Sequence, residues 1–196
     1  QKFPPAYEVD GAPYRNVIIS DNKVILQNFP NAAYGCAVER TFELKKNRLI
    51  IETSLIKTGD IKHGLMLGPQ MLTQFMRPDK ITFQTSTAPA DHLEGYLGLQ
   101  GTTPQFKKNE LDESRFTYDV DKSYAADWKF GTQTLFTQLE FKSHFLNTYV
   151  LYNASSAVFP EKNCNVSFYF PETPTDYIEV SNTGELYELK EGKTKA

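Results

Sequence analysis

Glu179 is the residue of this sequence whose surroundings point most directly to chemistry. It stands between Ile178 and Val180, in a short run that alternates polar and apolar residues as a half-buried strand does. On such a strand the carboxylate projects from the face opposite to the two apolar side chains, where it can act as a base or accept hydrogen bonds from a ligand. The ordinary alternative is a glutamate that faces solvent.

The chain also has three histidines that could move a proton near neutral pH, His63, His92 and His144. An ordinary surface or hydrogen-bonded histidine is the favoured interpretation of each. No spacing typical of zinc, calcium or phosphate ligands occurs, and no Gly-x-Ser-x-Gly elbow of a serine hydrolase is present. The sequence therefore predicts neither a metal nor another cofactor.

Two further side chains could contact a ligand. Arg40 shares one face of a predicted strand with apolar residues, so it either pairs with a carboxylate inside the sheet or reaches a ligand. Trp128 is the only tryptophan, and its ring could offer a flat platform to a sugar ring, although most such aromatic residues belong to a core.

The elements that position these residues are predicted to be strands. Residues 38–44 alternate in period two, and residues 49–56 carry β-branched residues on both faces. Lys45-Lys46-Asn47 between them makes a turn, which predicts a hairpin. Many further short apolar runs are bounded by Gly, Pro, Asn or Asp, and none keeps a helical period. We therefore expect an all-β fold, an antiparallel β-sandwich. Residues 86–114 interrupt the pattern and are predicted to be a long loop excursion.

Composition narrows the class of protein. A chain of 196 residues with 40% hydrophobic residues can bury a sizeable core, so one domain spanning residues 1–196 is expected. The net charge of −3 comes from interspersed acidic and basic residues, so no basic surface favours nucleic acid. No apolar run is long enough to cross a bilayer, and no membrane span is expected.

Several features bear on the compartment. The sequence begins with Gln1 and not with methionine, as a chain does after removal of a signal peptide, a propeptide or an N-terminal portion of a longer protein. Among these, a signal peptide would imply the secreted or periplasmic location that we expect. Cys36 and Cys164 allow one disulfide, and two buried thiols are the equal alternative. Asn153 and Asn165 begin glycosylation sequons, which arise often by chance.

Four stretches resemble proteins of the galactose-mutarotase-like β-supersandwich superfamily. In residues 176–194, a glutamate on a late strand, Glu179, is followed by the turn Leu-Lys-Glu-Gly-Lys-Thr. Residues 38–60 are similar to a strand pair of this superfamily that ends in a Gly-Asp turn. Residues 4–14 and 128–131 look closer to uncharacterised secreted members than to true aldose epimerases. Because whole supersandwiches are larger, the resemblance implies the C-terminal part of a longer one.

The resemblance also implies site residues. A mutarotase needs a carboxylate base and an imidazole acid on opposite sides of a sugar ring. Glu179 would be the base, but counting from Asp60 puts Gln70 at the place of the family's histidine, and glutamine cannot donate a proton in this way. His63 is the nearest histidine that could substitute. Gln70, Arg40 and Trp128 would then contact the carbohydrate.

Three hypotheses follow for the function. The first is a secreted protein that recognises a small or polymeric carbohydrate without ordinary mutarotase activity. The second is a carbohydrate-active enzyme on the same scaffold, an epimerase or an enzyme that acts on polysaccharides. The third is a structural or protein-interaction domain.

Overall fold

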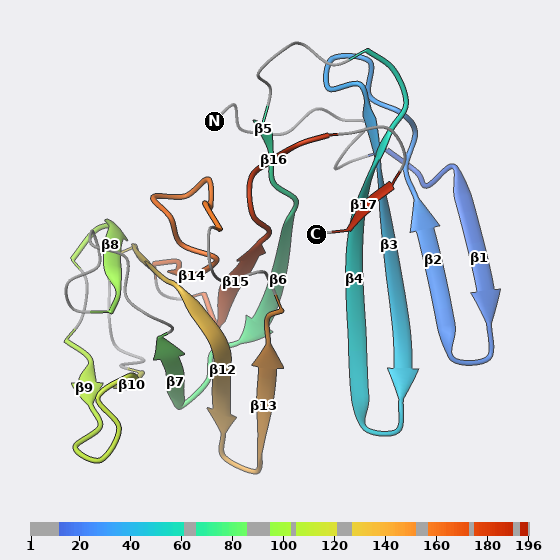
Figure 1. Cartoon of the computed structure of the whole chain (residues 1–196). Coiled ribbons are helices and arrows are strands. Elements are labelled where there is room, and N and C mark those ends of the chain that lie inside the picture. The colour runs from blue at the N-terminus through green and yellow to red at the C-terminus, as the bar shows by residue number, and fades with distance from the viewer. Residues whose placement is uncertain are drawn as a thin grey trace. The chain divides into compact units, whose positions relative to one another are not determined.

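A computed structural model describes residues 12–60, 66–85, 95–102, 105–120, 127–151, 157–172, 175–189 and 193–195. Every regular element in these ranges is a β-strand, and the paired strands run antiparallel (Figure 1), so the all-β, antiparallel prediction is confirmed. The chain divides into two compact units. The first unit joins Gln1–Pro69 to Leu186–Ala196, and the second is Gln70–Glu185. That the whole chain acts as one domain stays a prediction.

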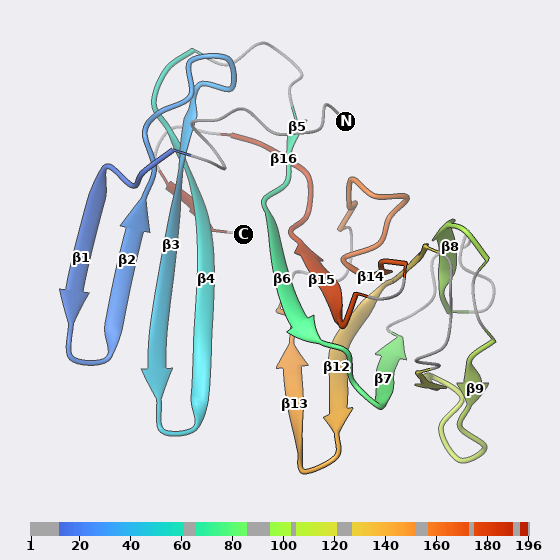
Figure 2. The ribbon, with the colours of Figure 1, turned by 180° about the vertical axis from the view of Figure 1, so that it is seen from behind.

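The first unit contains a five-stranded sheet in the order β1-β2-β3-β4-β17. Figure 2 shows β1 to β4 side by side as two long hairpins. A separate pair of short strands, β5 and β16, joins the two ends of this unit. The strands are β1 Asn16–Ser20, β2 Lys23–Gln27, β3 Cys36–Lys45, β4 Arg48–Lys57, β5 Met66–Leu67, β16 Tyr187–Glu188 and β17 Lys193–Lys195.

The predicted hairpin is the centre of that sheet. β3 and β4 pair in one unbroken register from Cys36 opposite Lys57 to Lys45 opposite Arg48. The chain reverses at Lys46, whose φ of 55° is left-handed. The pairing of residues 38–44 with residues 49–56 is therefore confirmed.

The two faces of this sheet differ in polarity. Because directly paired residues share a face, Ile19, Val24, Phe42 and Ile51 form one apolar row across four strands. At one end of the same face, Val38 and Leu55 are buried in a small cluster. Its other members are Cys36, Leu189, Tyr34 and Leu67. We call this the apolar face. The opposite face mixes charged and amide side chains with Ile18, Ile25, Ile50 and Ile56.

The second unit is a sandwich of two five-stranded sheets, in the orders β13-β12-β7-β10-β9 and β6-β15-β14-β11-β8. Period-two alternation sends one side of each strand into the space between the sheets. The strands are β6 Gln70–Met76, β7 Lys80–Thr85, β8 Leu97–Gln100, β9 Lys107–Lys108, β10 Arg115–Asp119, β11 Trp128–Thr132, β12 Thr134–Phe141, β13 His144–Tyr149, β14 Val166–Phe170 and β15 Tyr177–Thr183.

Aromatic side chains dominate the core of this sandwich. Phe83 is fully buried and packs with four other rings, while Trp128 stacks on Phe170 with ring centroids 3.8 Å apart. The buried members of the core are Ile81, Phe83, Phe116, Tyr118, Trp128, Phe130, Leu139, Val166, Phe168, Phe170, Ile178 and Val180. Both sheets contribute to this core, so it holds the sandwich together.

The region predicted as a loop excursion is partly ordered into strands. β8 and β9 both lie within residues 86–114, and β8 forms an edge of one sheet beside β11. Tyr96 and Phe106, from the same region, pack against the core. Two-residue and four-residue edge strands leave too short a pattern to be recognised in a sequence. His92, in the same region, lies outside the described residues.

The structure shows the state of the two cysteines and of one glycosylation sequon. Cys36 and Cys164 are both buried thiols, not a disulfide. Asn165 has no exposed surface, and its side-chain amide bonds both backbone groups of Thr134, at 2.8 Å each. In the folded chain this sequon therefore cannot carry a glycan. Asn153 lies outside the described residues.

Candidate functional site

The outer face of the β6-β15-β14-β11-β8 sheet is the surface that contains Glu179. Ile178 and Val180 point into the core, so Glu179 between them projects from the opposite side of β15. The strand pairings continue this position across the whole sheet. One long polar side chain from each strand stands in a single cross-strand row, consisting of Gln74, Glu179, Tyr169, Lys129 and Gln100. We call this the polar row.

Glu179 is half-buried in the polar row and is held from one side. Gln74, directly opposite on β6, donates a hydrogen bond from Nε2 to Glu179 Oε1 at 3.1 Å. Tyr169 is its direct neighbour on the other side, on β14. The carboxylate has a second oxygen to offer to a ligand hydroxyl, and such charge-assisted hydrogen bonds are the stronger kind.

Gln70 lies on the same face but farther along the strands. It donates a hydrogen bond from Nε2 to Ser181 Oγ at 2.6 Å. In the register Gln70 is opposite Thr183, whereas Glu179 is opposite Gln74, four positions away. At about 3.3 Å per residue, the two side chains are attached roughly 13 Å apart. The structure therefore places both on one sheet face, but not as a pair around one group.

Tyr169 extends the polar row beyond Glu179. Its hydroxyl donates a hydrogen bond of 2.9 Å to Asp127 Oδ2, and the other oxygen of Asp127 accepts the backbone N–H of Glu172. Burial, the hydrogen bond to Asp127 and the nearby carboxylates raise the pKa of Tyr169 to about 12. The phenol therefore remains protonated at neutral pH and is fixed in direction.

The next position in the row is equally fixed. Lys129 forms an ion pair with Glu161 Oε1, and Ser167 donates a hydrogen bond to Glu161 Oε2 at 2.9 Å. Both ionic side chains are about three-quarters shielded from solvent, with 22% and 25% exposed. A partly shielded pair with a third hydrogen bond holds its geometry better than an exposed pair does.

The other residues predicted at a site belong to other elements or fall outside the described residues. Arg40 is on β3 of the first unit, half-buried on the apolar face opposite Thr53, as its pattern predicted. Trp128 is 1% exposed and stacks on Phe170, so its ring belongs to the core, the alternative that the sequence offered. His63 lies outside the described residues. His144 is exposed on β13 beside Phe141, with ring centroids 4.8 Å apart.

Sequence reasoning missed most of the polar row. Tyr169 and Lys129 each occupy an alternate position between buried residues, and Gln74 lies between two half-buried ones. This alternation was visible in the sequence. What the sequence lacked was the order of the strands, which brings these positions together.

A shallow hollow of about 370 Å³ in the first unit involves other residues. It is lined by Arg15, Asn16, Val17, Ile18, Ile25, Gln27 and Glu39.

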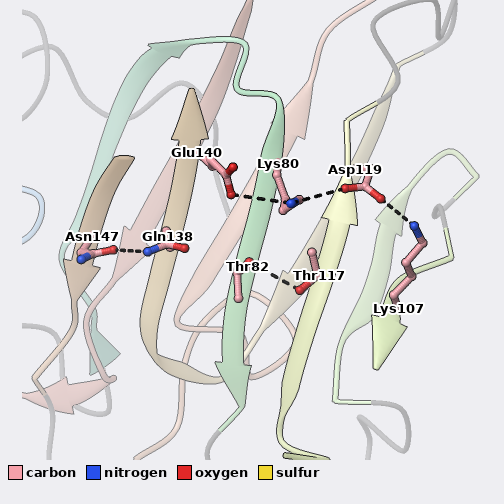
Figure 3. A network of polar contacts seen from close by, with 8 residues as sticks. All are labelled: Lys80, Thr82, Lys107, Thr117, Asp119, Gln138, Glu140 and Asn147. Carbon is pink, nitrogen blue, oxygen red and sulfur yellow. Dashed lines mark hydrogen bonds and ion pairs between the residues drawn. The ribbon is translucent and has the colours of Figure 1, made fainter. Parts of the chain in front are cut away.

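The outer face of the opposite sheet carries its own polar network (Figure 3). Lys80 lies between Glu140 and Asp119, at 3.7 and 4.0 Å, and Lys107 contacts Asp119 at 2.6 Å. Charges of alternating sign thus follow one another across four strands. A second row pairs amides and hydroxyls. It contains the contacts Gln138 with Asn147 and Thr82 with Thr117.

Replacing Asp119 by asparagine should change how stability depends on pH. The hydrogen bond from Lys107, together with the charges of Lys107 and Lys80, lowers the pKa of Asp119. The stability that the charge of Asp119 contributes is therefore present above the unfolded-state pKa, near 3.9. It is lost as pH falls through the lower pKa of the folded state. We expect Asp119→Asn to cost under about 1 kcal/mol at pH 7 and less than that at pH 3.

Urea unfolding at the two pH values measures this difference. Asp176→Asn, at an exposed carboxylate just before β15, is the control. An equal loss for Asp119→Asn at both pH values would show that the charge of Asp119 does not contribute.

Neither a metal nor a membrane helix is indicated by the described residues. They contain no group of three or more His, Cys, Asp or Glu side chains that could hold a metal ion. The part of the chain that the structure describes also has no helix long and apolar enough to cross a bilayer. No family model, curated protein or solved structure matches the chain.

Proposed function

We propose that this protein recognises a carbohydrate on the outer face of the β6-β15-β14-β11-β8 sheet, without ordinary mutarotase activity. The observation that carries the proposal is the polar row. Sugar hydroxyls both donate and accept hydrogen bonds, and the row offers a carboxylate, a phenol, two amides and an ammonium group. The mutarotase-like family and an exported location are parts of the same proposal.

The geometry favours an extended ligand. Five strands at about 4.8 Å spacing make a row roughly 19 Å long, which is longer than one sugar ring. The side chains are also oriented before any ligand arrives, because Glu179 is held by Gln74 and Tyr169 by Asp127. Preorganised polar groups lose little conformational freedom on binding. An oligosaccharide lying across the strands therefore fits better than a monosaccharide.

The same geometry argues against sugar-ring opening at this face. Ring opening needs an acid and a base that flank one ring. Gln70 is roughly 13 Å from Glu179 along the sheet, and its amide cannot act as an acid. Polarimetry on fresh α-glucose and α-galactose should therefore show the rate of buffer alone. A catalysed rate that falls in His63→Ala would support the enzyme hypothesis instead.

Binding to an array of oligosaccharides, followed by titration calorimetry on the best of them, tests recognition directly. Glu179→Ala should weaken binding by about 10-fold or more, because hydrogen bonds to a charged group contribute about 1.5–3 kcal/mol. Glu140→Ala, which removes a carboxylate from the outer face of the opposite sheet, should leave binding unchanged. Equal weakening by both variants, or no binding to any oligosaccharide, would contradict the proposal.

A further inference from the structure

β1 is an edge strand that lacks the usual protection against pairing. It pairs with β2 on one side, and no other described strand pairs with its outer edge (Figure 1). All five of its residues are exposed, and Val17, Ile18 and Ile19 are 53%, 59% and 74% exposed. Natural edge strands are usually blunted by a charge, a proline or a bulge. β1 has none of these, and its register with β2 is regular throughout.

We propose that β1 pairs antiparallel with β1 of a second copy of this chain, about a two-fold axis through Ile18. In this register Ile18 lies opposite Ile18 of the second copy, and Val17 lies opposite Ile19. Asn16 lies opposite Ser20. Every apolar residue of the strand thus meets an apolar residue, which is the self-complementarity that a two-fold interface requires.

The charges that flank β1 favour the same register. Arg15 precedes the strand and Asp21 follows it, both are exposed, and neither forms an ion pair with another described residue. Pairing about Ile18 brings Arg15 of each copy opposite Asp21 of the other, at both ends of the contact. A shift of two residues in either direction would place Arg15 opposite Ile19 or Asp21 opposite Val17. Only the pairing about Ile18 matches both the charges and the apolar residues.

The pairing also continues the apolar face from one copy to the next. Val17 and Ile19 belong to that face, and their rows run through Leu26 and through Val24 into the body of the sheet. One five-residue strand buries less than the roughly 800 Å² per partner of a standard interface. We therefore expect a reversible, concentration-dependent dimer. This inference does not depend on the proposed carbohydrate site, which lies in the other unit.

Cross-linking with Ile18→Cys tests the register. Directly opposite residues of antiparallel strands have Cα atoms about 4.5–5.5 Å apart, within the range of a disulfide. In a glutathione redox buffer, most of this variant should run as a covalent dimer on a non-reducing gel. Ile50→Cys is the matched control. It replaces the same residue type on the same face, at 43% exposure, but on β4, away from the proposed contact. The native thiols are buried and do not interfere.

A charge exchange gives an independent test by sedimentation equilibrium. Asp21→Arg places like charges at both ends of the contact and should raise the dimer dissociation constant about 10-fold or more. Adding Arg15→Asp to it should restore dimerisation. The proposal is overturned if Ile18→Cys cross-links no more than Ile50→Cys. It is also overturned if the wild type stays monomeric, or if the exchange of both charges fails to restore the dimer.

Discussion

Replacing Phe83 by alanine should lower the free energy of unfolding by about 3–5 kcal/mol, the usual cost of removing a fully buried aromatic ring. Phe83 has no exposed surface. Its ring stacks on Phe116 at 5.4 Å and meets Phe106 edge-on at 5.3 Å, and Phe130 approaches from the opposite sheet at 5.7 Å. The alanine would leave a cavity at the centre of the sandwich that these rigid rings cannot fill.

The single tryptophan reports this loss, because Trp128 is buried in the same core. Urea unfolding followed by its fluorescence should show the midpoint move while the slope of the transition stays constant. Phe145→Ala is the control. It deletes the same side chain where it is 64% exposed, and it should cost well under 1 kcal/mol. Similar losses for both variants would mean that Phe83 does not pack as described.

Replacing Asn165 by leucine should cost about 2–5 kcal/mol, although the two side chains are similar in size. The Asn165 amide accepts from the Thr134 N–H and donates to the Thr134 carbonyl, both at 2.8 Å. Leucine would leave both backbone groups buried without a partner, and each such group costs about 1–3 kcal/mol. The backbone of Asn165 also bonds Thr132 and Thr183, so the residue joins strands of both sheets.

Asn147→Leu is the matched control for this second substitution. Asn147 accepts one hydrogen bond from Gln138 on the exposed outer face, where water can replace the lost partner. Thermal unfolding followed by circular dichroism should therefore show a large fall in the melting temperature for Asn165→Leu and almost none for Asn147→Leu. A melting temperature near that of the wild type for Asn165→Leu would show that the Thr134 contacts are unimportant for stability.

Local patterns were enough to predict the strands but not their neighbours. The hairpin of β3 and β4 was predictable because its two halves are adjacent in sequence around one polar turn. The first half alternates in period two, and the second is rich in β-branched residues. By contrast, β15 lies between β6 and β14, and β6 is about a hundred residues earlier in the chain. A sequence pattern gives the face of a residue, and only the folded topology gives its neighbour on the next strand.

The candidate site shows the same limit. The position of Glu179 opposite to Ile178 and Val180 followed from alternation alone. Tyr169 and Lys129 also alternate with buried residues, but nothing in the sequence indicates that they meet Glu179 in one row. For Trp128 the sequence was open to a binding role that the structure does not give it. Phe130, two residues later and therefore on the same face of the strand, already indicated that this face is buried.

Each unit contains one buried thiol whose rate of alkylation reports how often that unit opens. Cys36 belongs to the first unit and Cys164 to the second, and burial raises the pKa of both, to about 12 for Cys164. A thiol that is both shielded and protonated reacts with an alkylating reagent only when its surroundings open. The two labelling rates, separated by mass spectrometry of peptides, therefore measure the opening free energies of the two units in one experiment. Equal rates would mean that the chain opens as a single cooperative body.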